Sequence, residues 1–67
     1  MRQICVNGET RAIAHGRTLL DLIHLLDLNP ERLAVELDRK IVKKMEWAST
    51  ELRDGAKLEI VQFVGGG

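Results

Sequence analysis

Four apolar side chains between positions 19 and 26 follow the period of a helix that buries one stripe. They stand at spacings i, i+3, i+4 and i+7, and they are Leu19, Leu22, Ile23 and Leu26. Thr18 precedes them, and Asp21 follows Thr18 by three positions, a spacing that favours reciprocal capping of a helix N-terminus. We therefore expect a helix that begins after Thr18 and ends before Asn29-Pro30. Leu20 and Leu25 flank the stripe and should be partly covered.

Shorter segments rich in branched or alternating apolar residues lie on both sides of this helix and predict strands. Five segments fit, at residues 2–6, 9–13, 33–37, 41–42 and 57–64. The dipeptides Asn7-Gly8 and Asp54-Gly55 favour tight turns. Between residues 43 and 51 the pattern is irregular and leaves room for a helical turn around Met45 and Trp47. A tryptophan in so small a chain is expected to pack against the core rather than to bind a ligand.

Alternation along the last strand separates a core face from an outer face. Leu58 and Ile60 share the core face, and the outer face carries Glu59, Val61 and Phe63. Because the chain offers only one helical stripe, only one face of a single sheet can be covered. The sequence therefore predicts an α+β fold with one helix across a sheet of four to five strands.

The outer face of the other strands also carries small or apolar residues. In the first strand Ile4 and Val6 point to the core and Cys5 points outward, while Ile13 is the expected core residue of the second strand. Ala34 points outward in the 33–37 segment. If the first, third and last strands are neighbours, Cys5 and Ala34 lie near the outer residues of the last strand. Exposed apolar side chains grouped in this way indicate a docking surface.

Size and charge narrow the function classes. A chain of 67 residues is one domain that buries only about 60% of its unfolded surface, which leaves no room for a deep cleft and disfavours an autonomous enzyme. Ten Lys and Arg balance ten Asp and Glu, without the basic stripe of a nucleic-acid-binding protein. No apolar run approaches the length that spans a membrane. A lone cysteine and the lack of a signal-like start fit a reducing cytoplasm.

The most unusual segment is Val64-Gly65-Gly66-Gly67. Three glycines have no side chain to pack and lose much backbone entropy when they are ordered, so a fold gains nothing from them. Without Cβ atoms, an extended tail of residues 64–67 can enter a narrow channel of a partner and reach roughly 13 to 14 Å. The plain alternative is a frayed terminus. We interpret the chain as one domain, residues 1–67, in which 64–67 form a functional tail that ends at the Gly67 carboxylate.

Several short motifs occur in an order that resembles a known family. They are the opening strand that ends at Asn7, Gly16-Arg17-Thr18 before the helix, Ala34-Val35, Ile41-Val42 followed by Trp47, Leu52 with Asp54-Gly55, and the terminal glycines. In this order and spacing the chain resembles the small β-grasp sulfur carriers of the ThiS/MoaD family, whose fold is ubiquitin-like. Lys43 and Ala56 depart from the family pattern at turns.

The resemblance implies a protein co-substrate of enzymes rather than an enzyme. An E1-like adenylyltransferase (ThiF-type) would adenylate Gly67 with ATP and Mg²⁺, and a sulfur donor such as a cysteine desulfurase would convert it to a thiocarboxylate. A thiazole synthase (ThiG-type) would then take the sulfur for thiamin. Gly65 and Gly66 would thread the partner's active site. The face that binds partners would comprise Glu59, Val61, Phe63 and Val64, and the chain itself would bind no cofactor or metal.

Two alternatives stay open at this point. The chain could be the small subunit of molybdopterin synthase, which has the same fold, or a ubiquitin-like modifier or interaction module. Cys5 is expected to act as a small apolar residue and not as the sulfur carrier. The spacing of Cys5, His15 and His24 matches no zinc pattern.

Overall fold

Strands β1 (Arg2–Val6) and β2 (Glu9–Ile13) form an antiparallel hairpin through the Asn7-Gly8 turn. Asn7 has φ of 49° and Gly8 has φ of 84°. A type I′ turn, which joins two strands through two residues, requires positive φ at both of them. This turn, predicted from the dipeptide, is confirmed in the computed structural model, which describes residues 1–64.

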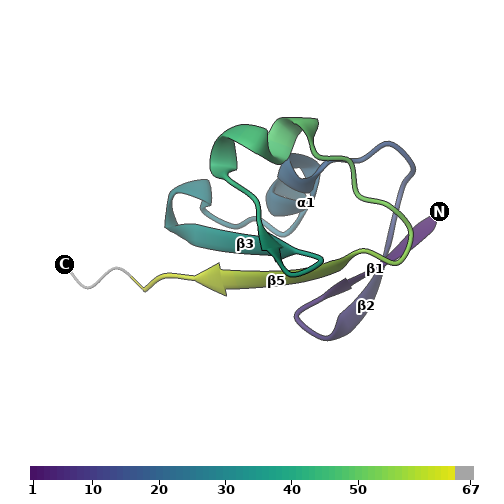
Figure 1. Cartoon of the computed structure of the whole chain (residues 1–67), viewed down its shortest axis with the longest axis horizontal. Coiled ribbons are helices and arrows are strands. Elements are labelled where there is room, and N and C mark those ends of the chain that lie inside the picture. The colour runs from purple at the N-terminus through teal and green to yellow at the C-terminus, as the bar shows by residue number, and fades with distance from the viewer. Residues whose placement is uncertain (65–67) are drawn as a thin grey trace.

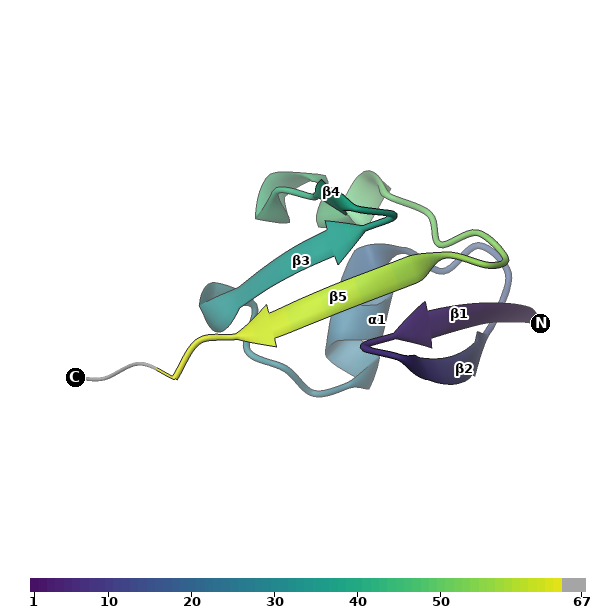
Figure 2. The same ribbon diagram turned by 60° about the horizontal axis from the view of Figure 1, so that its bottom comes forward.

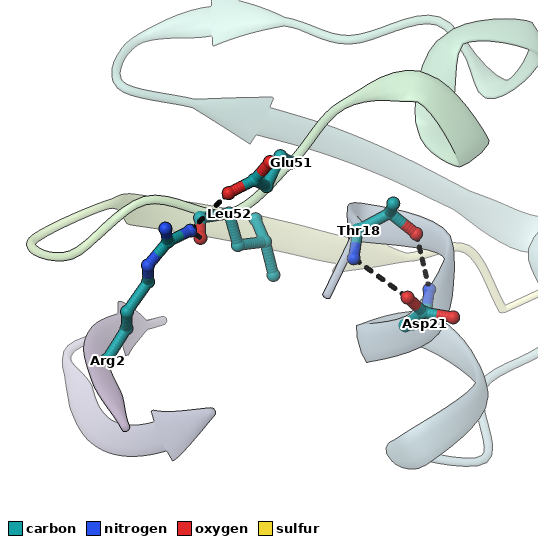
Figure 3. A network of polar contacts seen from close by, with 5 residues as sticks. All are labelled: Arg2, Thr18, Asp21, Glu51 and Leu52. Carbon is teal, nitrogen blue, oxygen red and sulfur yellow. Dashed lines mark hydrogen bonds and ion pairs between the residues drawn. The ribbon is translucent and has the colours of Figure 1, made fainter. Parts of the chain in front are cut away.

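Helix α1 (Leu19–Leu25) begins with the predicted reciprocal cap. The Asp21 backbone N–H donates to the Thr18 hydroxyl, and the Thr18 backbone N–H donates to the Asp21 carboxylate at 2.8 Å; both bonds are drawn in Figure 3. The hydrogen bond from the Thr18 backbone is the main cause that lowers the pKa of Asp21. The cap satisfies backbone donors that the first turn leaves without partners.

The buried stripe of α1 is shorter than the sequence predicted. Leu19, Leu22 and Ile23 are buried, as expected, but Leu26 is only half-buried. Leu26 is the C-cap residue, so it lies at the end of the helix, where fewer neighbours cover it. Leu25 was expected to be partly covered and is instead 68% exposed, because it follows Ile23 by two residues and therefore points away from the buried side.

The rest of the chain adds three strands and two short 3-10 helices. In order they are η1 (Pro30–Arg32), β3 (Leu33–Leu37), β4 (Lys40–Ile41), η2 (Lys44–Ser49) and β5 (Lys57–Gln62). The helical turn around Met45 and Trp47 is confirmed as η2. Two predicted strand limits were wrong: the edge strand begins one residue earlier than 41–42, and the last strand ends at Gln62. Gln62 is opposite Leu33, the first residue of β3, so the pairing stops where β3 begins.

The five strands form one mixed sheet in the order β2-β1-β5-β3-β4. β5 lies in the centre, parallel to β1 and antiparallel to β3. Helix α1 and η2 lie on one side of this sheet (Figure 1). Figure 2 shows the sheet from the other side, with α1 behind the strands. The predicted α+β fold, with one helix across one sheet face, is confirmed.

The core lies between the sheet and α1 and is completed by η2. Among residues 1–64, eleven buried hydrophobic residues form it: Ile4, Val6, Ile13, Leu19, Leu22, Ile23, Val35, Trp47, Leu52, Ala56 and Leu58. Trp47 is only 1% exposed, and its indole N–H donates to the Val42 carbonyl at 2.9 Å. The expectation that Trp47 packs against the core is therefore confirmed. Within residues 1–64, no helix has the length and apolar character needed to cross a membrane.

Candidate functional site

The uncovered side of the sheet carries the residues that the sequence assigned to partner binding. We call the part of this side near the end of β5 the open face, and it comprises Ala34, Glu36, Ile41, Glu59, Val61 and Phe63. Val61 and Phe63 are each 55% exposed, whereas Leu58 on the covered side of β5 is 1% exposed. The predicted separation of the two faces of the last strand is confirmed.

The end of β5 is held from both sides. On the β3 side, the Phe63 backbone N–H donates to the Arg32 carbonyl at 2.7 Å. On the β1 side, the Asn7 carboxamide accepts from the Ile60 N–H at 2.7 Å and donates to the Ile60 carbonyl at 3.1 Å. β1 has already ended at Val6, so this side chain replaces a strand residue as the partner of β5. The last strand therefore keeps a fixed direction up to the residue before Val64.

The sequence could not reveal this second function of Asn7. Asparagine was expected only as a turn residue, and its carboxamide contacts a residue 53 positions away. A contact that distant leaves no local pattern, and only the register of β1 against β5 brings the two groups together.

The two residues that were expected near Val61 behave differently. Ala34 is directly opposite Val61 in the pairing of β3 and β5, so that expectation is confirmed. Cys5 is instead opposite Lys57, four residues before Val61, which is about 13 Å along a strand. The expectation for Cys5 was wrong because β1 runs parallel to β5 and pairs only with its beginning.

Two further residues of the open face were not singled out from the sequence. Glu36 is directly opposite Glu59 on β5 and directly opposite Ile41 on β4. Ile41 is 76% exposed. Glu36 could have been placed outward from the alternation of residues 33–37, but its neighbours depend on strand order.

The tail itself is only partly within the described residues. Val64 follows β5 and is 95% exposed, so no core contact covers the residue that leads into the glycines. The expected roles of Gly65, Gly66 and Gly67 lie outside the described residues and stay predictions.

A polar network closes the opposite end of the sheet (Figure 3). Arg2 pairs with Glu51 and also donates to the Leu52 carbonyl at 2.9 Å. The hydrogen bond from Arg2 is the main cause that lowers the pKa of Glu51. This network joins β1 to the segment before β5, and its groups are occupied with one another, so it supports the fold rather than forming a reactive site.

An open groove of about 460 Å³ also lies at this end, between the end of β2 and α1, and Arg17, Asp21 and His24 are among its lining residues. Asp21 is already used in the helix cap. Within residues 1–64, no three His, Cys, Asp or Glu side chains are grouped so that they could hold a metal ion. The open face and the end of β5 therefore form the stronger candidate site.

Comparison with known proteins gives a consistent result. The model of the ThiS family matches residues 4–67. A thiazole synthase of Paramagnetospirillum magneticum is 38% identical over 97% of this chain, which spans only 20% of that protein's length. The sulfur carrier protein ThiS of Escherichia coli is 29% identical over 97% of this chain and 98% of its own. The crystal structure of the thiamine biosynthesis protein (ThiS) from Geobacter metallireducens superposes with a TM-score of 0.82 at 26% identity, covering 97% of this chain and 99% of that one.

Proposed function

The chain belongs to the ThiS family, and from that premise we propose that it is a sulfur carrier protein of thiamin biosynthesis. It acts as a protein co-substrate of other enzymes and has no catalytic residues of its own. The observation that carries this proposal is the end of β5. There a centrally placed strand leaves the core, exposes Val61, Phe63 and Val64, and leads in the sequence directly to Gly65-Gly66-Gly67.

The chemistry begins at the carboxylate of Gly67, which resists substitution because it lacks a leaving group. A carboxylate oxygen attacks the α-phosphorus of ATP, pyrophosphate leaves, and an acyl adenylate forms. A sulfide equivalent from a donor then attacks the carbonyl carbon, AMP leaves, and a thiocarboxylate remains. The partner supplies Mg²⁺ and cationic groups that stabilise the developing phosphate charge. This chain supplies the carboxylate and its position.

The open face supplies the binding energy for these partners. Val61 and Phe63 present apolar surface beside the origin of the tail, and buried aromatic and aliphatic side chains near the centre of an interface dominate affinity. Glu59 and Val64 border them on the same strand and at its exit. Glycines 65 and 66 have no Cβ atoms, so they can pass between the walls of an active site that would exclude larger residues.

Three partners follow from this role. A ThiF-type adenylyltransferase uses ATP and Mg²⁺ to activate Gly67. A cysteine desulfurase or similar donor provides sulfur as a persulfide, and a thiol reductant cleaves the resulting acyl disulfide to leave the thiocarboxylate. A thiazole synthase (ThiG-type) then accepts the sulfur. The relatives named thiazole synthase support the last of these partners over a molybdopterin synthase. The requirement for ATP and a sulfur donor favours a cytoplasmic reaction.

Intact mass spectrometry tests the proposal. The chain is incubated with a ThiF-type adenylyltransferase, Mg-ATP and a sulfide source, with a reaction that lacks ATP as the control. We expect the mass to rise by the replacement of one oxygen by sulfur, only when ATP is present. An unchanged mass would refute the carrier role, and a mass increase equal to a second protein would indicate a modifier instead. Transfer of the sulfur into thiazole rather than into a dithiolene would separate this carrier from the molybdopterin synthase subunit.

A further inference from the structure

Two glutamates are paired across the centre of the open face. Glu36 on β3 is directly opposite Glu59 on β5, and both side chains are exposed. Directly opposite residues of an antiparallel pair point to the same face with their Cβ atoms roughly 5 Å apart, and like charges in that arrangement destabilise the sheet. The free protein therefore places two like charges opposite each other at this position.

Lys57 lies two residues before Glu59 on the same face of β5, but no ion pair within residues 1–64 joins a cation to Glu36 or Glu59. The ion pairs in that part of the chain are Arg2 with Glu51 and Lys44 with Glu31, so neither carboxylate takes part in one. Charged residues on an edge strand commonly prevent pairing with the strand of another molecule. Glu36 and Glu59 do not have that role, because β3 and β5 are both interior strands. A glutamate opposite a lysine would keep the face equally soluble without repulsion.

The position of the pair suggests what it binds. Val61 and Ala34 form the next pair on the same face toward the tail, and Ile41 on β4 is directly opposite Glu36. A partner that covers the exposed Val61, Phe63 and Ile41 must also cover the two carboxylates between them. Burying a carboxylate is costly unless a cation pairs with it and donates hydrogen bonds. The partner therefore has to present positive charge at this point.

We propose that Glu36 and Glu59 form the charge-recognition element of the open face, and that the activating enzyme presents a cationic side chain that bridges them. This inference rests on the proposed sulfur-carrier function. Arginine fits best, because its planar guanidinium carries five donors and can bind two carboxylates at once. Val61 and Phe63 then provide apolar contact, while the carboxylates set the register of docking and speed the encounter.

The pair predicts opposite effects on stability and on binding, which a merely structural role would not produce. Glu36→Gln and Glu59→Gln should each raise the melting temperature by about 2 to 5 °C, since each removes the repulsion. The same variants should bind a ThiF-type adenylyltransferase with an association rate about tenfold lower at low salt, and this difference should shrink at high salt. Glu36→Lys, which creates an attractive pair in the free protein, should show the largest rise in melting temperature and the largest loss of binding.

Glu9→Gln is the matched control, because it removes the same charge from an exposed residue of β2 opposite Val6, on the other side of the sheet. Differential scanning fluorimetry and stopped-flow binding at two salt concentrations give the two readouts, and Glu9→Gln should bind as the wild type does. If Glu36→Gln and Glu59→Gln bind at the same rate as the wild type, the charge-recognition role is overturned and the carrier function still stands. Lower melting temperatures in those variants would equally overturn it. A wild-type chain that neither binds nor is adenylated would refute both proposals.

Discussion

Leu58 and Val61 are three residues apart on β5, yet Leu58 is 1% exposed and Val61 is 55% exposed. Residues 57–60, which we call the inner half, have β1 or the Asn7 carboxamide on one side, and from Leu58 onward they have β3 on the other. Residues 61–64, which we call the outer half, are the last two residues of β5 and the two that follow it, and they extend beyond the end of β1 (Figure 2). The inner half carries most of the burial and the outer half carries the exposed apolar surface.

This difference separates what stabilises the protein from what it presents to others. Leu58 in the inner half can be changed only at the expense of the fold, because its side chain belongs to a core of eleven buried residues. The outer half is anchored by backbone bonds, such as that from Phe63 to Arg32, so its side chains are free for a partner. Four substitutions or extensions test how complete this separation is.

The largest effect is expected in the inner half. Leu58→Ala should lower the free energy of unfolding by about 2 to 5 kcal/mol, because it removes buried apolar atoms and leaves a cavity. Val61→Ala in the outer half is the matched control and should change it by less than ~0.5 kcal/mol. Urea denaturation followed by tryptophan fluorescence measures both. Equal losses in the two variants would show that the outer half also belongs to the core.

Next in size is the effect of lengthening the tail. One alanine added after Gly67 moves the carboxylate by roughly 3.5 Å, and misplacing a reacting group by about 1 Å can cost a hundredfold in rate. We expect adenylation at least ~100-fold slower with unchanged stability, since among residues 1–64 no fully buried core residue lies beyond Leu58. ATP–pyrophosphate exchange at saturating carrier measures the rate. Equal rates for both lengths would mean that the Gly67 carboxylate does not react.

A somewhat smaller effect is expected on docking. Phe63→Asp should weaken binding to the adenylyltransferase at least ~30-fold, because a central aromatic contact commonly contributes about 2 kcal/mol or more. Leu25→Asp introduces the same charge at another exposed apolar residue, on α1, and should bind normally. Calorimetric titration compares the two. Equal weakening would indicate a general charge effect, and unchanged affinity for Phe63→Asp would remove the open face as the docking surface.

The smallest effect is expected at Cys5. Its thiol is half-buried and free, and it lies beside the inner half of β5, away from the tail. Cys5→Ser should reduce stability by no more than about 1 kcal/mol and should leave sulfur loading unchanged. Intact mass after loading gives the answer, with thermal melting as the folding control. A folded variant that never acquires sulfur would place the sulfur on this thiol instead of on Gly67.

The sequence alone determined the features that depend on neighbouring residues. The Thr18 and Asp21 cap, the Asn7-Gly8 hairpin and the two faces of β5 were all predicted, because each arises from backbone geometry within a few positions. The exposure of Val61 and Phe63 followed from alternation and from the single helical stripe. The functional tail was inferred from the lack of side chains in the terminal glycines, its chemistry was implied by the resemblance, and both stay predictions.

Only the tertiary structure decided which residues meet across the sheet. It placed Cys5 opposite Lys57 and away from Val61, attached the Asn7 carboxamide to Ile60, and set Glu36 against Glu59. The physical reason is that strand order and register are fixed by the summed packing of the whole core, so shifting one strand by a residue would turn all its side chains to the other face. Local patterns specify each strand's faces, but the neighbours of each side chain exist only once the strands have assembled.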